Sequence, residues 1–172
     1  MKSINYILCL FAFVGCSQVW PKKIHQKKGQ VFMVMVPDCP LSQSYSTPFL
    51  RLKKKYENSL DFFLVVPAKF YQKNEIKNFI NMYNIPENML FIDKNNQLAS
   101  EINATISPEF FLFDSAKNVK YQGAFDDWVE DLGSKRIVRK TNNFLSLAID
   151  SFLNGTRIKN AYKQAEGCYI EY

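Results

Sequence analysis

The spacing of apolar and polar residues divides the chain into alternating strands and helices. Short apolar runs between turn-forming residues predict strands, because buried strands are apolar on both faces. Strands are expected at residues 31–37, 62–67, 89–93, 106–114 and 119–123. A turn at residues 117–118 joins the last two strands into a hairpin.

Segments with apolar residues three and four positions apart lie between or after these strands and predict amphipathic helices. We expect helices at residues 41–57, 74–83, 97–103 and 142–154. Parallel strands joined by helices and followed by a hairpin give a mixed sheet. The sequence therefore predicts one α/β domain over residues 31–154, a three-layer α/β/α arrangement with a central mixed sheet. Residues 155–172 are expected to form a C-terminal tail.

The first 15 residues have the pattern of a signal peptide. Lys2 supplies the positive start, and residues 7–14 form an apolar stretch that is too short to span a bilayer. The Phe-Val-Gly-Cys sequence at residues 13–16 resembles the lipobox of bacterial lipoproteins, which implies that Cys16 is lipid-modified. The alternative is an ordinary secretory signal with an incidental Cys16. No acidic residue directly follows Cys16, so we expect an exported protein anchored to the outer membrane and facing the periplasm.

Residues 16–30 are predicted to form a basic tether between the lipid and the domain. Lysines cluster at positions 22, 23, 27 and 28, and the net charge of the whole chain is +6. This cluster fits an anionic membrane surface. Nucleic-acid binding would require a basic stripe interleaved with exposed aromatic residues, which the sequence lacks. The single histidine, His25, lies in this tether, so we expect neither a metal site nor a cofactor.

Cys39 stands where a buried strand meets a helix. It follows an apolar run and precedes Pro40, a residue that suits the first turn of a helix. The helix dipole and the free backbone N–H groups there favour a thiolate. The alternative is a small buried hydrophobe, which is how most free cysteines behave. The polar neighbours Asp38, Ser42 and Gln43 favour the reactive interpretation.

The four cysteines of the chain reduce to two free thiols. Cys9 would be removed with the signal peptide and Cys16 would be acylated, so Cys39 and Cys168 remain. In an oxidising compartment two such thiols are a candidate redox pair or a structural disulfide. A third possibility is that Cys168 stays unpaired.

The strand, Cys39-Pro40 and helix, followed by Ser107-Pro108 before a hairpin, resemble the thioredoxin fold over residues 31–153. The resemblance implies that Pro108 is cis and lies against the active cysteine. Residues 38–45 are similar to the redoxin branch named after alkyl hydroperoxide reductase and thiol-specific antioxidant.

Separated pieces at residues 122–127, 135–136 and 167–170 resemble an exported subgroup of thioredoxin-like proteins. These resemblances imply roles around Cys39. The residues beside the thiol are Asp38, Pro40, Ser42 and Ser107. Glu109 is a candidate proton relay because it follows Pro108, and the alternative is an exposed acid at the start of a strand. The subgroup resemblance places Asp126, Asp127 and Arg136 on the rim. The alternative for the last three is that they are solvated loop charges.

Two positions depart from the relatives. Ser42 stands where a thioredoxin has its second cysteine, which excludes a dithiol mechanism within the motif. Val36 stands where a peroxiredoxin has the threonine that orients peroxide. The resemblance therefore implies a membrane-tethered thiol-disulfide oxidoreductase with Cys39 as nucleophile, Pro108 shaping the substrate groove and Cys168 resolving. The alternatives are a thiol peroxidase and a redox-inert binding module. The implied partners are protein or small-molecule thiols, disulfides or peroxides, and no nucleic acid.

Overall fold

A computed structural model describes residues 19–21, 27–128 and 142–172. The strands are β1 (Gly29–Val34), β2 (Leu60–Pro67), β3 (Leu90–Asp93), β4 (Ile106–Ser107), β5 (Glu109–Asp114), β6 (Val119–Gly123), β7 (Tyr162–Lys163) and β8 (Cys168–Tyr169). The helices are α1 (Pro40–Tyr56), α2 (Lys73–Tyr83), α3 (Gln97–Glu101) and α4 (Phe144–Leu153), with a 3-10 turn η1 (Glu87–Met89) before β3.

The central sheet is mixed, with the strand order β3-β2-β1-β5-β6-β7. β1 is parallel to β2 and antiparallel to β5, and β2 is parallel to β3. The β5–β6 hairpin continues the sheet, and β7 joins its outer edge parallel to β6. β4 and β8 form a separate antiparallel pair. The predicted α/β fold with a central mixed sheet is confirmed.

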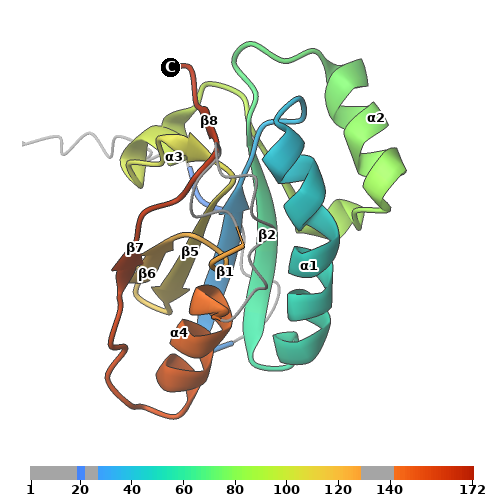
Figure 1. Cartoon of the computed structure of the whole chain (residues 1–172). Helices are drawn as coiled ribbons and strands as arrows, with labels where there is room; N and C mark the ends of the chain where they lie inside the picture. The colour runs from blue at the N-terminus through green and yellow to red at the C-terminus, as the bar shows by residue number, and fades with distance from the viewer. Residues whose placement is uncertain (1–18, 22–26, 129–141) are drawn as a thin grey trace, which may run out of the picture.

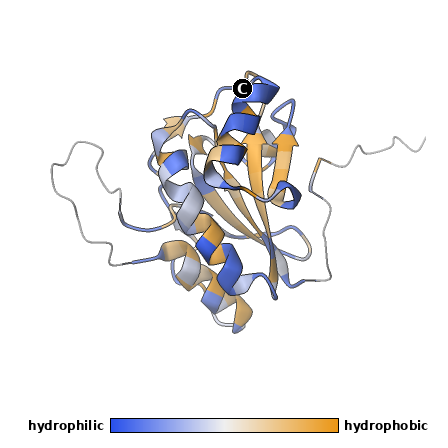
Figure 2. Ribbon diagram, turned by 90° about the vertical axis from the view of Figure 1, so that its right-hand side faces the viewer, coloured by the Kyte–Doolittle hydropathy of each residue, from blue (hydrophilic) through white to orange (hydrophobic). Residues whose placement is uncertain are grey.

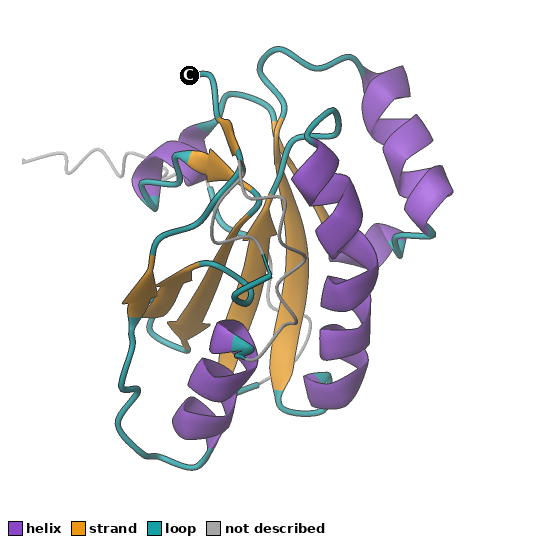
Figure 3. Ribbon diagram, in the orientation of Figure 1, coloured by secondary structure: helices purple, strands orange, loops and turns teal. Residues whose placement is uncertain are grey.

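Helices α1, α2 and α4 cover one face of the central sheet (Figures 1 and 3). Alternate residues of β1, Val31 and Met33, enter this core together with Phe49 of α1 and Leu145 of α4. The alternation follows from the two-residue period of a strand. Figure 2 shows the result, in which hydrophobic strands are flanked by helices with hydrophilic stretches. Burial of this apolar surface, worth about 25 cal/mol per Å², is the main force that holds the helices in place.

The other face is covered by α3 and by two short segments from outside the strand–helix core. The Trp20 ring lies 5.5 Å from the Phe32 ring and 4.9 Å from the Phe113 ring, between centroids. Its indole N–H donates a 2.7 Å hydrogen bond to the Glu101 carboxylate. Ile170 is buried in the same cluster. Helices therefore lie on both faces, as expected. The second face is covered in addition by Trp20, which precedes β1, and by Ile170, which follows α4.

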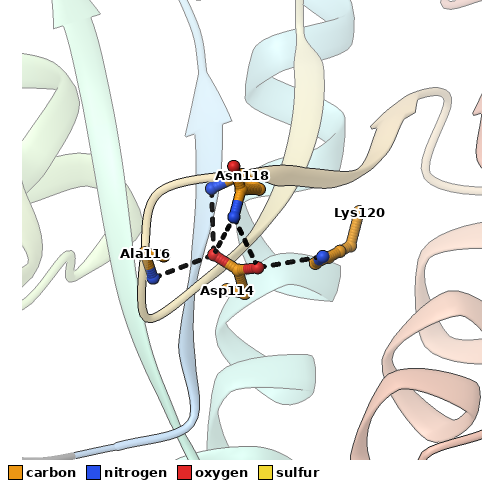
Figure 4. Close-up of polar contacts among 4 residues, drawn as sticks. All are labelled: Asp114, Ala116, Asn118 and Lys120. Atoms are coloured by element: carbon orange, nitrogen blue, oxygen red, sulfur yellow. Dashed lines mark hydrogen bonds and ion pairs between the residues drawn. The ribbon is translucent and has the colours of Figure 1, made fainter.

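Asp114 closes the β5–β6 hairpin (Figure 4). Its carboxylate accepts hydrogen bonds from the backbone N–H groups of Ala116 and Asn118, each 2.9 Å long. The Lys120 ammonium lies 2.9 Å away. Burial alone would raise the pKa of Asp114, but these donors outweigh it and hold the pKa well below its usual range.

The strands differ from the predicted ones at several places, and β2 begins two residues earlier than expected. β1 begins at Gly29 and ends at Val34, earlier than expected at both ends. The expected strand at residues 106–114 is two strands, because Pro108 has no N–H to donate and its peptide bond to Ser107 is cis. β7 and β8 were not predicted, since a two-residue strand leaves no periodic pattern in a sequence.

Several predictions from the N-terminus and the late loop concern residues beyond those described. They are the signal peptide at 1–15, Cys16, His25, Lys135 and Arg136. Within residues 19–21, 27–128 and 142–172, no helix is both long and apolar enough to cross a membrane. In the same part of the chain, no three residues of the His, Cys, Asp or Glu types gather where they could hold a metal ion.

Candidate functional site

Cys39 occupies the position just before α1. It is the N-cap residue in an extended conformation (φ −74°, ψ 120°), and Pro40 opens the helix, as predicted. The predicted helix 41–57 corresponds to α1 within one residue at each end. Only 1% of Cys39 is exposed. The first turn of α1 contains no acidic side chain, so no nearby carboxylate on the helix opposes a thiolate there.

Ser107 connects the two loops that meet at this point. Its hydroxyl oxygen accepts a 2.7 Å hydrogen bond from the Val36 N–H and lies 2.7 Å from the Ser42 hydroxyl. Its carbonyl oxygen lies 3.0 Å from Cys39 Sγ, which donates to it in the thiol form. Pro108 follows directly through the cis peptide bond that the resemblance implied. The structure thus brings Ser42, Ser107 and Cys39 together, and Pro108 adjoins them in the chain.

Cys168 reaches Cys39 on β8. This strand pairs antiparallel with β4, placing Cys168 opposite Ser107 and Tyr169 opposite Ile106. Figure 1 shows β8 at the end of the molecule where α1 begins. Both cysteines are free thiols, and the Cys168 thiol donates a hydrogen bond to Cys39 Sγ over 2.7 Å. Two cysteines separated by most of the chain are therefore in direct contact.

The surroundings shift the pKa values of the two thiols in opposite directions. Burial raises the pKa of Cys39, but it is outweighed by hydrogen bonds from the Cys168 thiol, from the backbone N–H groups of Ser42 and Cys168 and from the Ser42 hydroxyl, so the pKa is lowered. The Ser107 carbonyl favours the protonated thiol and works against them. Burial, the hydrogen bond to Cys39 and the charges of Cys39 and Asp38 raise the pKa of Cys168 to about 12. Of the two sulfurs, Cys39 is therefore the one whose surroundings favour the thiolate, and Cys168 is the one that holds its proton more strongly.

A cleft of about 160 Å³ opens beside the sulfurs. The residues that line it are Val36, Asp38, Cys39, Pro67, Phe70, Tyr71, Cys168, Tyr169, Ile170 and Glu171. The Tyr71 hydroxyl donates a 2.7 Å hydrogen bond to Asp38, while burial and this bond raise the pKa of the tyrosine. Phe70 and Tyr169 are exposed at the cleft. Sequence reasoning missed Tyr71, Phe70 and Tyr169, because no motif near them in the sequence indicates that they share a cleft with Cys39.

Glu109 does not contact the thiol pair in the way that a proton relay would. Its carboxylate oxygens accept hydrogen bonds from the Thr105 N–H and the Gln122 side chain. Among the described residues, no hydrogen bond joins it to Cys39. Burial raises the pKa of Glu109 although these donors act in the opposite direction.

Asp126 and Asp127 are buried, so they are not solvated loop charges. Asp126 accepts a 2.7 Å hydrogen bond from the Tyr45 hydroxyl of α1. Asp127 accepts hydrogen bonds from the backbone N–H and the side-chain amide of Asn142. These contacts connect the loop after β6 to α1 and to the residue before α4. Neither carboxylate lines the cleft.

Comparisons with known proteins identify the fold but no family. No protein-family model matches the chain. No curated protein matches it either.

Solved structures do match. An uncharacterized conserved protein from Geobacillus kaustophilus shares 21% sequence identity with a TM-score of 0.69, and the match covers 85% of this chain and 78% of that one. A thioredoxin-like protein solved in its oxidized form shares 14% with a TM-score of 0.57, covering 77% and 82%. A candidate thiol:disulfide interchange protein DsbE from Chlorobium tepidum shares 13% with a TM-score of 0.52, covering 74% and 79%. The chain has a thioredoxin-like fold.

Proposed function

We propose that the protein is a thiol-disulfide oxidoreductase in which Cys39 is the nucleophile and Cys168 the resolving thiol. The observation that supports this most directly is the 2.7 Å separation of the two sulfurs at the start of α1. The opposite pKa shifts of the two thiols fit these roles, because the attacking sulfur must be ionised and the second must hold its proton until needed. The thioredoxin-like protein and the DsbE-type neighbour have the same fold.

The exchange proceeds in two displacements. The Cys39 thiolate attacks a substrate disulfide, a bond forms between Cys39 and one substrate sulfur, and the other leaves with the bonding electrons and takes up a proton. Cys168 then loses its proton and attacks Cys39 Sγ, forming the Cys39–Cys168 disulfide and releasing the second substrate thiol. The chain has given two electrons and the Cys168 proton to the substrate, and the second proton comes from solvent. A partner dithiol restores them, and the reverse sequence oxidises a substrate dithiol.

Neighbouring groups assist the attacking sulfur without joining the reaction. The N–H groups at the start of α1 and the Ser42 hydroxyl stabilise negative charge on Cys39. Ser42 also hydrogen-bonds Ser107, so its hydroxyl fixes the position of the β4 segment. Ser42 has no sulfur and cannot resolve a mixed disulfide, which leaves this step to Cys168.

Peroxide reduction is the second candidate and is less well supported. A peroxide would oxidise Cys39 to a sulfenic acid, and Cys168 would capture it with loss of water. Val36, which lines the cleft, offers no hydroxyl to orient a peroxide. A redox-inert binding module is the third possibility, because the same cleft could hold a partner without turnover.

We further propose that the protein belongs to the redoxin branch, in its exported lipoprotein subgroup. The support is the sequence alone: the signal-like residues 1–15, the lipobox-like cysteine Cys16, and the separated motif pieces that occur in the expected order. A lipid on Cys16 would keep the cleft close to a membrane, where exported protein disulfides would be its substrates.

A redox titration of the purified chain tests the proposed reaction. Thiols are alkylated at each potential and counted by mass spectrometry, with Cys39→Ser and Cys168→Ser as variants and Ser44→Ala as a matched control at the exposed surface of α1. We expect a reversible Cys39–Cys168 disulfide with a potential between about −120 and −270 mV. A potential below about −300 mV would make the link structural. Peroxide consumption that depends on Cys39 would favour the peroxidase instead.

A further inference from the structure

The C-terminal segment covers the outer edge of β4. β4 and β8 form a sheet of their own, and no other strand pairs with β4 within residues 19–21, 27–128 and 142–172. The pairing continues past β8, because the Ile170 N–H donates a 3.0 Å hydrogen bond to the Thr105 carbonyl. The segment thus lies beside Cys39 as an added antiparallel strand. Strand addition to a free edge is also a general way in which proteins bind extended peptides.

Three of the four positions in this segment, Gly167, Cys168 and Ile170, are each restricted in a different way. A Cβ atom on Gly167 would lie 2.0 Å from the Ser107 carbonyl oxygen, so the backbone approach leaves room for glycine alone. Cys168 follows, in contact with Cys39. Tyr169 is 83% exposed and restricts nothing, whereas Ile170 is 7% exposed and packs in the second core. The surface therefore selects the pattern glycine, cysteine, any residue, apolar residue.

The same segment closes access to the nucleophile. With β8 in place Cys39 is 1% exposed, and the Cys168 sulfur occupies the position from which another sulfur would approach. A cysteine from another protein that takes the position of Cys168 meets Cys39 directly. The polypeptide on either side of that cysteine would then lie where β8 lies, paired with β4.

We propose that the protein substrates are extended segments with the pattern glycine–cysteine–any–apolar, which replace β8 on the edge of β4. The proposal rests on the exchange reaction proposed above and specifies which cysteines it acts on. The chain's own residues 167–170 are then an internal copy of the substrate. An incoming segment regains the backbone hydrogen bonds that β8 gives up, so the two make similar contacts with β4. β8 has the advantage of a high local concentration, because it is attached to the same chain.

Beyond the strand pairing and the packing of Ile170 in the second core, two hydrogen bonds hold the end of the segment in place. The Asn96 side-chain amide donates a 2.7 Å hydrogen bond to the Glu171 carbonyl, and the Tyr172 hydroxyl donates one to the Ala104 carbonyl. These bonds lie at the exposed C-terminal end of the segment. Loss of these bonds would free β8 from that end without disturbing α1 or the central sheet. The arrangement suits a strand that detaches to admit a substrate.

A reactive peptide tests the proposal directly. The peptide Ala-Glu-Gly-Cys-Tyr-Ile, which copies residues 165–170, is prepared with its cysteine as a 2-pyridyl disulfide and added to the Cys168→Ser chain. Cys39 forms a disulfide with the peptide sulfur, the bond to the pyridyl sulfur breaks, and thiopyridone leaves with the electron pair and is followed by absorbance. We expect peptides carrying Gly167→Ala or Ile170→Asp, and a scrambled peptide, to react about tenfold more slowly or worse, since each loses one restricted contact.

A second arm weakens the internal competitor. In the Cys168→Ser chain, Ile170→Ala should raise the rate with the copied peptide several-fold, because β8 then detaches more easily, while Leu147→Ala on the exposed side of α4 should not change it. Tyr172→Phe, which removes only the hydroxyl bond to Ala104, replaces Ile170→Ala if that variant does not fold. Equal rates for the copied and scrambled peptides would overturn the inference. A chain whose Cys39 fails to react even with bis(2-hydroxyethyl) disulfide would instead overturn the proposed function.

Discussion

The two faces of the central sheet are covered in different ways, and each contributes one sulfur to the site. Three helices, each next in sequence to the strands it covers, pack on the first face, and α1 carries Cys39 at its start. The second face has the five-residue α3 together with Trp20 and Ile170, and Ile170 follows β8 with its Cys168. Cys39, the proposed nucleophile, therefore belongs to the locally determined half of the fold. Its partner belongs to the half that long-range contacts assemble.

This difference has a chemical consequence. A thiol fixed at a helix start keeps its hydrogen-bond donors as long as the helix exists. A thiol on a two-residue strand keeps its position only while that strand stays paired. We infer that α1 supplies the hydrogen-bond donors that Cys39 always keeps, and that the second face sets how often Cys168 is available to it, both as a further donor and as a second thiol. Variants on each face should separate the two properties.

The largest effect is expected when the two sulfurs are removed in turn. Cys39→Ser should reduce exchange with a disulfide to the background rate, since no nucleophile remains. Cys168→Ser should still release the first thiol in a single turnover and then stop as a mixed disulfide on Cys39. Mass spectrometry of the trapped species distinguishes the two. A Cys39→Ser chain that forms a mixed disulfide through Cys168 would show that the roles are reversed.

Trp20→Ala tests the cover of the second face. Removal of this buried ring should lower the free energy of unfolding by about 3–5 kcal/mol, as large-to-small changes in a core do. Phe49→Ala on the first face should cost a similar amount, and Phe70→Ala at an exposed position should change stability by less than about 0.5 kcal/mol. Denaturant unfolding gives the three values.

Hydrogen exchange in Trp20→Ala and Phe49→Ala shows whether the two faces open separately. In Trp20→Ala, hydrogen exchange should rise at α3 and around Ile170 more than at the start of α1, because Trp20, Leu98 and Ile170 share one cluster. In Phe49→Ala the order should be the opposite. Equal increases at both sites in both variants would mean that the faces open as one unit.

The sequence predicted the first face well and the second face poorly. The run before Cys39, the proline after it and the amphipathic pattern to residue 57 are local signals, and they placed α1 correctly. The cis form of Pro108 followed from the resemblance and is confirmed. Trp20 lies in a segment predicted as a tether, and its burial depends on rings at Phe32 and Phe113 that no local pattern connects to it.

The site shows the same limit. Residues beside Cys39 and Ser107 indicate their positions, but the sequence leaves the Cys39–Cys168 contact open, because an unpaired Cys168 is one of its three alternatives. β8 is two residues long, and its register depends on the close approach of Gly167 to Ser107. The position of Glu109 next to Pro108 and the subgroup resemblance at Asp126 predict that both lie near the thiol, and the structure shows Glu109 bonded to Gln122 and Asp126 bonded to Tyr45. Side chains that pair across long separations cannot be assigned from spacing.

The pH dependence of alkylation tests how the second face acts on the first. The pKa of Cys39 is lowered, so its alkylation should already be fast at pH values below the pKa of an ordinary thiol. The rate should rise little at higher pH. Cys168→Ala removes the thiol that donates to Cys39, so the profile should move to higher pH and the rate at pH 7 should fall. Leu147→Ala on the exposed side of α4 is the control. An unchanged profile would mean that the α1 N–H groups and Ser42 stabilise the thiolate without help from β8.

Glu109→Gln is expected to have the smallest effect, at the junction of β5 and the loop before β4. Burial raises the pKa of Glu109 above that of the unfolded chain, so its favourable contribution is complete at low pH and is lost as the pH rises through the folded pKa. Glutamine has the same shape, can still accept from Thr105, and carries no charge to desolvate. The variant should therefore gain stability relative to the parent between pH 4 and pH 7, within about 1 kcal/mol. Urea unfolding at both pH values measures the free energy of unfolding of the variant and the parent. A variant less stable than the parent at pH 7 would mean that the hydrogen bonds to the charged carboxylate outweigh the cost of its burial.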